Sequence, residues 1–275
     1  MPIELIETGS PELQASREDG ILTLTLNRPE ARNAMTAAMI VALSQALAAA
    51  EIDTEVRCVI LTGAGAGFCA GGDVKGMAEH GDGSGASNTV DAIIHRQRLA
   101  QHATAGRLFK MPKPTIAAIN GAAAGAGLAL AMACDIRLMS SAAVLTTAFA
   151  KIGLSGDFGG AYFLTRLVGT AKARELLFLS DRIDAAEAVG IGLVNRAVAP
   201  EDLATETARW AVRLAAGPSV AFRYMKENLN RALGGEIDDC LDVEVTHHIH
   251  CFATSDHREA ARAFVERRDP VFVGA

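Results

Sequence analysis

The apolar positions in the first two thirds of the chain follow two different periods. ILTLTL at 21–26 alternates apolar with polar residues and predicts a strand. The segment 34–50 has instead the spacing and the Ala, Leu and Met content of a helix, with Asn33 as its N-cap. A second helix is expected from about Asp91 to Phe109. Further strands are predicted at CVILTG (58–63), PTIAAIN (114–120), DIRLMS (135–140) and LVNRAV (193–198).

Beyond Gly153 the pattern becomes mostly helical. Strands that alternate with helices are typical of an α/β fold, which we expect over residues 1–200. Residues 201–275 are predicted to form a helical cap or assembly region. Neither a fixed-period repeat nor a linker marks a second independent domain. The helices expected in the last third of the chain are 172–180, 184–190, 201–216, 219–233, 237–253 and 256–268.

Composition narrows the class of protein. The 275 residues are 50% hydrophobic and 21% charged, which excludes a disordered chain. The net charge of −6 argues against a nucleic-acid partner, because phosphate contacts need a basic field. A small anionic ligand, held by a few local positive groups, remains compatible with this charge.

Two features of the sequence indicate where in the cell the protein is located. The twenty uncharged residues from Thr115 to Cys134 are long enough for a membrane helix, but Asn120 and Gly121 break them, so we expect a buried strand, a turn and a buried helix and no membrane partner. The five cysteines form no CxxC pair, and no export signal is visible at the N-terminus. Both observations favour a reduced, cytoplasmic protein.

The main chemical signal is a pair of loops rich in Gly and Ala, at 63–73 and 121–127. Each follows a predicted strand and leads into a predicted helix, whose N-terminus offers unpaired backbone N–H groups. Two such loops could converge on a developing negative charge, or their small residues could only permit tight packing. Neither loop has the third glycine of a dinucleotide motif, and GKS and GKT are absent.

Asp157 is the strongest candidate among the acidic side chains. It lies in IGLSGDFGGAYFL, where the apolar and glycine-rich surroundings would raise its pKa toward the range used in proton transfer. The alternative is an N-cap for the helix that starts near Gly159 or Gly160.

Metal and serine chemistry find little support in the sequence. His247, His248, His250 and Cys251 share one predicted helix, but their spacing does not place three ligands on one face, and we predict no metal. GxSxG is also absent.

Five segments, in this order, resemble the crotonase superfamily of enoyl-CoA hydratases and isomerases, and they span nearly the whole chain. The segments are NRPEARNAM (27–35), LTGAGAGFCAGGDVKGM (61–77), PKPTIAAINGAAAGAGLALAMACDIRL (112–138), IGLSGDFGGAYFLTRLVG (152–169) and AFVERRDPVFVG (263–274).

This resemblance implies a spiral of ββα units, a C-terminal helical trimerisation region and a homotrimer or hexamer. The ligand would be an acyl-CoA thioester, so coenzyme A would be part of the substrate and no separate cofactor is expected. The resemblance places the two oxyanion-hole N–H donors at Ala70 and Ala126, and it suggests that Phe149 narrows the acyl pocket. It also places the CoA-binding positions at Glu30, Ala31, Arg32, Gly71, Gly72 and Asp73.

One departure from the family pattern decides the predicted reaction. Hydratases of this family use two glutamates, and these positions hold Ala129 and Phe149 here. Asp157 matches a carboxylate position of isomerase-type members, so a double-bond isomerase with Asp157 as acid/base is the leading hypothesis. The alternatives are a hydratase with a relocated acid/base and a non-catalytic acyl-CoA binder.

Overall fold

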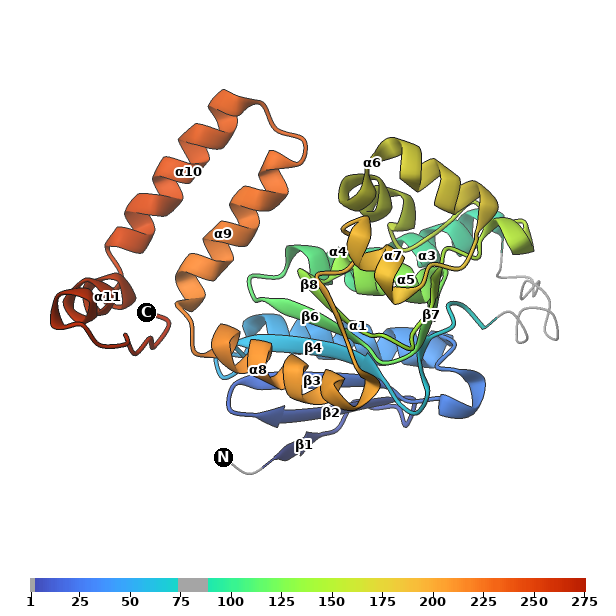
Figure 1. Ribbon diagram of the computed structural model, residues 1–275, viewed down its shortest axis with the longest axis horizontal. Helices are drawn as coiled ribbons and strands as arrows, with labels where there is room; N and C mark the ends of the chain where they lie inside the picture. The colour runs from blue at the N-terminus through green and yellow to red at the C-terminus, as the bar shows by residue number, and fades with distance from the viewer. Residues whose placement is uncertain (1–2, 74–88) are drawn as a thin grey trace.

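A seven-stranded sheet forms the centre of the computed structural model, which describes residues 3–73 and 89–275 (Figure 1). Its strand order is β1-β2-β3-β4-β6-β8-β10. The first three strands pair antiparallel, and every pairing from β3 to β10 is parallel. The strands are β1 (Glu4–Ile6), β2 (Leu13–Glu18), β3 (Ile21–Leu26), β4 (Cys58–Gly63), β6 (Thr115–Ile119), β8 (Ile136–Ser140) and β10 (Arg196–Val198).

The central strands are buried on both faces, which explains their continuous apolar runs. In β4, Val59 and Leu61 belong to the main core, whereas Cys58 and Ile60 face the opposite side. Helix α8 (Leu203–Ala215) covers that opposite side. Its amphipathic sequence buries an apolar stripe against the sheet (Figure 1).

A second, smaller sheet carries the loops of interest. It consists of three parallel strands in the order β5-β7-β9, namely β5 (Gly67–Cys69), β7 (Ala122–Ala124) and β9 (Leu145–Thr146). Strands of two or three residues leave too short a hydrophobic pattern to be recognised in the sequence, and we predicted none of the three.

The helices match the expected α/β arrangement. The α-helices are α1 (Ala37–Ile52), α3 (Val90–Ala103), α4 (Ala105–Lys110), α5 (Ala126–Ala133), α6 (Gly160–Leu179), α7 (Ala185–Gly190), α8, α9 (Ser219–Ala232), α10 (Ile237–Phe252) and α11 (Ser255–Glu266). The 3₁₀ helices are η1 (Pro29–Ala31), η2 (Ala150–Ile152) and η3 (Pro200–Asp202).

Several helix boundaries differ from the sequence-based expectation, and α6 begins at Gly160, twelve residues before the helix expected over 172–180. The predicted helix 91–109 is broken at Thr104, whose φ of −115° and ψ of −88° are not helical. Asn33 does not cap α1, because Thr36 accepts the capping hydrogen bond from the Met39 N–H. Asn33 instead has a positive φ of 57° and is fully buried, for the reason given below.

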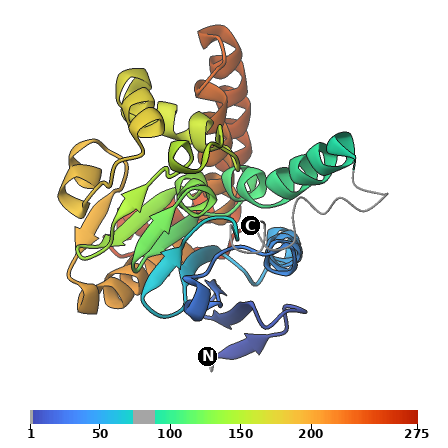
Figure 2. The ribbon, with the colours of Figure 1, turned by 90° about the vertical axis from the view of Figure 1, so that its right-hand side faces the viewer.

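Helices α9, α10 and α11 form an arm that projects away from the sheets (Figure 1), and Figure 2 shows it behind the core. Many large apolar side chains of this arm are exposed, and residues 201–275 as an assembly region remain a prediction. Within the described parts of the chain, no helix combines the length and apolarity needed to cross a membrane. The arm residues more than half exposed include Met225, Leu229, Ile237, Leu241, Val245, Ile249, Phe252, Phe264 and Val265.

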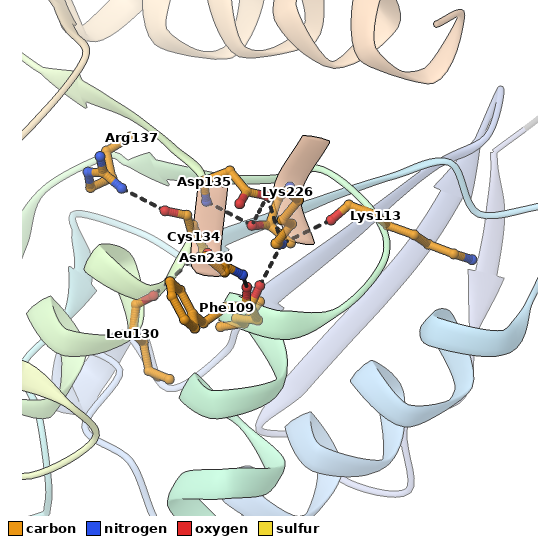
Figure 3. A network of polar contacts seen from close by, with 10 residues as sticks. Phe109, Lys113, Leu130, Cys134, Asp135, Arg137, Lys226 and Asn230 are labelled. Atoms are coloured by element: carbon orange, nitrogen blue, oxygen red, sulfur yellow. Dashed lines mark hydrogen bonds and ion pairs between the residues drawn. The ribbon is translucent and has the colours of Figure 1, made fainter. Parts of the chain in front are cut away.

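Lys226 attaches the first helix of the arm to the core (Figure 3). Its buried Nζ donates to the carbonyl oxygens of Leu108 at 2.9 Å and Lys113 at 3.2 Å, and to Asp135 Oδ2 at 2.8 Å. Nearby, Asn230 Nδ2 donates to the Phe109 carbonyl oxygen at 2.8 Å. A buried ammonium group with three acceptors is well satisfied, so this contact holds α9 in place.

Candidate functional site

Two asparagines, the buried Asn33 and the half-buried Asn120, shape the first glycine-rich loop. Asn33 Nδ2 donates to the carbonyl oxygens of Ala64 at 2.9 Å and Gly67 at 2.8 Å. From the second loop, Asn120 Nδ2 donates to the carbonyl oxygens of Gly63 at 2.9 Å and Gly67 at 3.3 Å. The loop carbonyls therefore point inward at side-chain amides, which holds residues 63–67 against the end of β6.

Glycine is required where the two loops meet. A Cβ on Gly121 would lie 1.9 Å from the Ala66 carbonyl oxygen, and one on Gly127 would lie 2.4 Å from that of Cys69. Tight packing therefore accounts for part of the glycine content, as the alternative interpretation of the sequence proposed. The same close approach places residues 70–72 beside the start of α5.

The Ala70 N–H is already used within the fold. It donates to the Arg32 carbonyl oxygen at 3.0 Å, which ties the loop to the segment that follows η1. A donor engaged in this way is not available to a ligand. This contact corrects the prediction that Ala70 supplies an oxyanion-hole N–H.

The backbone N–H of Gly72, unlike that of Ala70, is not used by another described residue. The bridge to Met35 uses the carbonyl oxygen of Gly71 and the N–H of Asp73, at 2.8 and 3.2 Å. Because successive peptide groups of an extended segment point to opposite sides, the intervening Gly72 N–H faces away from Met35. It donates no hydrogen bond within residues 3–73 and 89–275.

The second donor lies at the N-terminus of α5. The N-cap Gly125 has a φ of +51° and ψ of −124°, and the Ala126 N–H that follows donates no hydrogen bond within the described residues. Every residue of α5 is buried, so the partial positive charge of this helix end is poorly screened by water. A Cβ on Gly71 would lie only 3.5 Å from the Ala126 nitrogen, so the two loops converge, which is one of the two alternatives that the sequence left open.

Asp157 lies on a turn rich in left-handed backbone. Gly153, Gly156, Phe158 and Gly159 all have positive φ, and the buried Phe158 anchors the turn. The N-cap of α6 is Gly159, without a side-chain capping bond, so the capping alternative for Asp157 is wrong. The carboxyl group is half-buried, and this burial raises the pKa of Asp157 to about 6.

The two oxygens of Asp157 have different surroundings. Oδ2 accepts a hydrogen bond from Gln97 Nε2 of α3 at 3.4 Å. Oδ1 is buried and has no hydrogen-bond partner among the described residues. A buried carboxylate oxygen without a partner is costly in a folded protein, and it indicates a place where a ligand would bind.

Phe149 links Asp157 to the N-terminus of α5. Carbons of its ring would lie 3.7 Å from a Cβ on Gly125 and 3.9 Å from one on Gly156. These glycines immediately precede Ala126 and Asp157, so the buried Phe149 ring packs beside both the start of α5 and the Asp157 turn. Ala129 belongs to the same wall, because its Cβ and the Phe149 ring both lie within 3.7 Å of a Cβ on Gly160.

The predicted CoA-binding positions border the first loop. Glu30 and Arg32 are exposed and Ala31 is half-buried at η1, next to the glycine-rich loop. Arg28 was not predicted. It donates from Nη1 to the Ala34 carbonyl oxygen at 2.8 Å and to Asp73 Oδ2 at 3.1 Å, which fixes the end of the loop.

The histidines of α10 lie away from these loops. His247 contacts Asn228 and stacks on Tyr224, whose hydroxyl group lies 3.1 Å from His250 Nδ1. These side chains therefore join α10 to α9. The described ranges contain no group of three His, Cys, Asp or Glu side chains arranged to hold a metal ion.

Comparisons with known proteins support a common origin for this arrangement. The sequence profile of the enoyl-CoA hydratase/isomerase family matches residues 16–275. A 1,2-epoxyphenylacetyl-CoA isomerase of Escherichia coli is 37% identical over 94% of this chain and 96% of its own length. A short-chain-enoyl-CoA hydratase of Clostridium acetobutylicum is 36% identical over 92% of this chain and 94% of its own length.

A solved structure agrees with the sequence comparison. The crystal structure of an enoyl-CoA hydratase from Polaromonas sp. superposes with a TM-score of 0.88 at 35% identity, and the match covers 95% of this chain and 99% of that one. The predicted crotonase-like α/β fold is thus confirmed. The chain belongs to the enoyl-CoA hydratase/isomerase family.

Proposed function

We propose that the protein moves a double bond along the acyl group of an enoyl-CoA, with Asp157 as the single acid/base. The observation that carries this proposal is the buried Oδ1 of Asp157, which has no hydrogen-bond partner among the described residues and lies beside an apolar wall and two available backbone donors. A relative named as a 1,2-epoxyphenylacetyl-CoA isomerase, 37% identical to this chain, is compatible with isomerase-type chemistry.

The N–H groups of Gly72 and Ala126 would bind the thioester oxygen. Removal of a proton next to the thioester shifts negative charge onto that oxygen, and donors already fixed by the fold stabilise it without reorganisation. Each such donor contributes about 2.7–4 kcal/mol to the transition state of comparable reactions. Gly72 replaces Ala70 in this role because the Ala70 N–H donates to Arg32.

Asp157 would move one proton. Its carboxylate removes a proton from C2 of a trans-3-enoyl-CoA, which breaks the C2–H bond and leaves a dienolate. The same proton then goes to C4, so the product is a 2-enoyl-CoA and the carboxylate is regenerated. With its pKa raised to about 6, Asp157 is mostly ionised at neutral pH yet basic enough to take the proton.

The apolar wall argues against hydration. Addition of water needs a group that orients water and a group that protonates carbon, and the side chains at the two expected positions are those of Ala129 and Phe149. Neither can accept or donate a proton. The buried Phe149 ring beside the Asp157 turn also leaves an apolar surface where a hydratase would carry a carboxyl group.

The test supplies trans-3-enoyl-CoA and trans-2-enoyl-CoA separately in deuterated water and follows the products by mass. We expect double-bond migration from the first substrate and no 3-hydroxyacyl-CoA from the second. Asp157→Asn should reduce migration about 10²–10⁴-fold. Asp181→Asn, which changes an exposed aspartate, is the matched control and should keep the wild-type rate. Hydration of the second substrate, or full turnover by Asp157→Asn, would contradict the proposal.

A further inference from the structure

Gln97 is the residue that contacts the proposed acid/base from another element. It lies on α3, sixty positions before Asp157 in the sequence, and its Nε2 donates to Asp157 Oδ2 at 3.4 Å. None of the described side chains of α3 is fully buried, and Gln97 is among the half-buried ones. The helix therefore touches the acid/base through an amide group and not through an apolar core contact.

The contact distinguishes the two carboxyl oxygens. An ionised carboxylate has about four lone-pair positions. Here one oxygen is held by an amide, while the other is buried and has no partner in the part of the chain that the structure describes. An acid/base that moves one proton needs a free oxygen at a defined place, since proton transfer requires hydrogen-bond distance to the carbon-bound proton. A hydrogen bond to the other oxygen restricts rotation of the carboxyl group and meets this need.

We propose that Gln97 is a positioning residue, whose amide holds Oδ2 of Asp157 so that Oδ1 faces the acyl group. This inference rests on the proposed function of Asp157. Gln97 touches neither thioester nor reacting carbon in this role, and it acts only through Asp157.

Because no neighbouring charge shifts the pKa of Asp157, the effect of the Gln97 hydrogen bond on that pKa can be measured by itself. The titratable residues nearest to the pair in the sequence are His95, Arg96 and Arg98 on α3 and Lys151 on η2. Burial, and not a nearby charge, raises the pKa of Asp157. Loss of a donor to the ionised carboxylate should therefore raise that pKa further, because hydrogen bonding to the charged form favours it.

The experiment compares Gln97→Leu and Gln97→Glu with Gln101→Leu. Gln101 lies one helical turn later on α3 and is also half-buried, which makes it a matched control. We would measure kcat and KM for double-bond migration from pH 4.5 to 9. We expect Gln97→Leu to lower kcat about tenfold with little change in KM, since an unheld carboxyl group is less often in place. Gln97→Glu should lower it further, because it puts a like charge at the carboxyl group.

A second measurement uses the full chain without substrate. The carboxyl carbon of Asp157 would be titrated by NMR in protein labelled at aspartate, with its signal assigned from Asp157→Asn. We expect the titration midpoint to rise by about 0.5–1 pH unit in Gln97→Leu and to stay at the wild-type value in Gln101→Leu.

The two proposals fail in different ways. If Asp157→Asn is inactive while Gln97→Leu keeps the wild-type kcat and titration midpoint, the positioning role of Gln97 is wrong and the function of Asp157 stands. If Asp157→Asn keeps full turnover, the proposed function fails, and the positioning role fails with it even where the midpoint moves. A loss of kcat in Gln97→Leu without a moved midpoint also overturns the positioning role.

Discussion

Gly127 on α5 lies against the main chain of Cys69 on β5. A Cβ on Gly127 would lie 2.4 Å from the Cys69 carbonyl oxygen and 2.6 Å from its Cβ. This contact joins the two loops that carry the candidate oxyanion-hole donors. The spacing of Gly72 and Ala126 therefore depends on a residue without a side chain.

Gly127→Ala is expected to destabilise the protein by at least about 2 kcal/mol, because the added methyl group meets backbone that cannot move without disturbing β5. Chemical denaturation measures the change. Gly190→Ala on α7 is the control, since no atom lies within 4 Å of its Cβ position, and it should change stability by less than about 1 kcal/mol. Equal effects of the two substitutions would show that the loops do not pack as described.

Asp157 should make stability depend on pH. Its folded-state pKa of about 6 exceeds the ordinary value of 3.8, so the folded protein resists ionisation that the unfolded chain undergoes freely. The neutral carboxyl group imposes no such cost below pH 3.8, and the cost grows as the pH rises through 6. Asp157→Asn should therefore be more stable than wild type by about 1–2 kcal/mol at pH 8, after allowance for partial solvent access.

Thermal or denaturant unfolding at pH 8 and at pH 4 would measure this difference. The advantage of Asp157→Asn should shrink at pH 4, where most of the wild-type carboxyl groups in the folded protein are neutral. If Asp157→Asn and the wild type are equally stable at pH 8, the carboxyl group of Asp157 is not desolvated in the folded protein.

Phe149→Ala is expected to cost about 3 kcal/mol or more, because it removes a buried ring and leaves a cavity between α5 and the Asp157 turn. Water that enters this cavity should also lower the pKa of Asp157 toward its ordinary value. The pH dependence of kcat/KM and the titration midpoint of Asp157 would measure the second effect. Phe178→Ala, at a side chain 73% exposed, should alter neither property appreciably.

Lys226→Met should destabilise the protein by about 3 kcal/mol, because the change leaves Asp135 and two carbonyl oxygens without their donor. Hydrogen exchange of α9 amides should accelerate with it, since α9 loses its polar attachment to the core. Lys172→Met is the control: its ion pairs to Glu175 and Glu187 are solvent-exposed, so it should change stability by about 1 kcal/mol or less.

Several of the longer elements could be predicted from the sequence, whereas the six-residue strand β2 was not. Strands β3 and β4 have the predicted bounds, and the helices from α7 to α11 lie within two residues of the predicted ones at each end. Their hydrophobic pattern extends over enough residues to define a period. The two-residue strand β9 and the break at Thr104 have no such pattern, so they depend on their neighbours in space.

The candidate site was predictable in part. The loop composition and the apolar setting of Asp157 indicated an anion-stabilising loop pair and a desolvated carboxyl group. Which N–H of the first loop is available could not be predicted, because the Ala70 N–H is taken by Arg32, a residue 38 positions earlier. Gln97 was missed for the same reason, since its amide carries no signal until α3 lies against the Asp157 turn.

The sequence by itself determined the α/β class, the presence of two small-residue loops and the presence of one carboxyl group in apolar surroundings. These properties depend on local composition and period, which the chain carries wherever it lies. Only the tertiary structure decided which backbone donors of the described residues are left unpaired, which oxygen of Asp157 is held and which side chain packs beside the Asp157 turn. Such relationships depend on contacts between residues distant in the sequence, and those contacts exist only once the sheets and helices have packed.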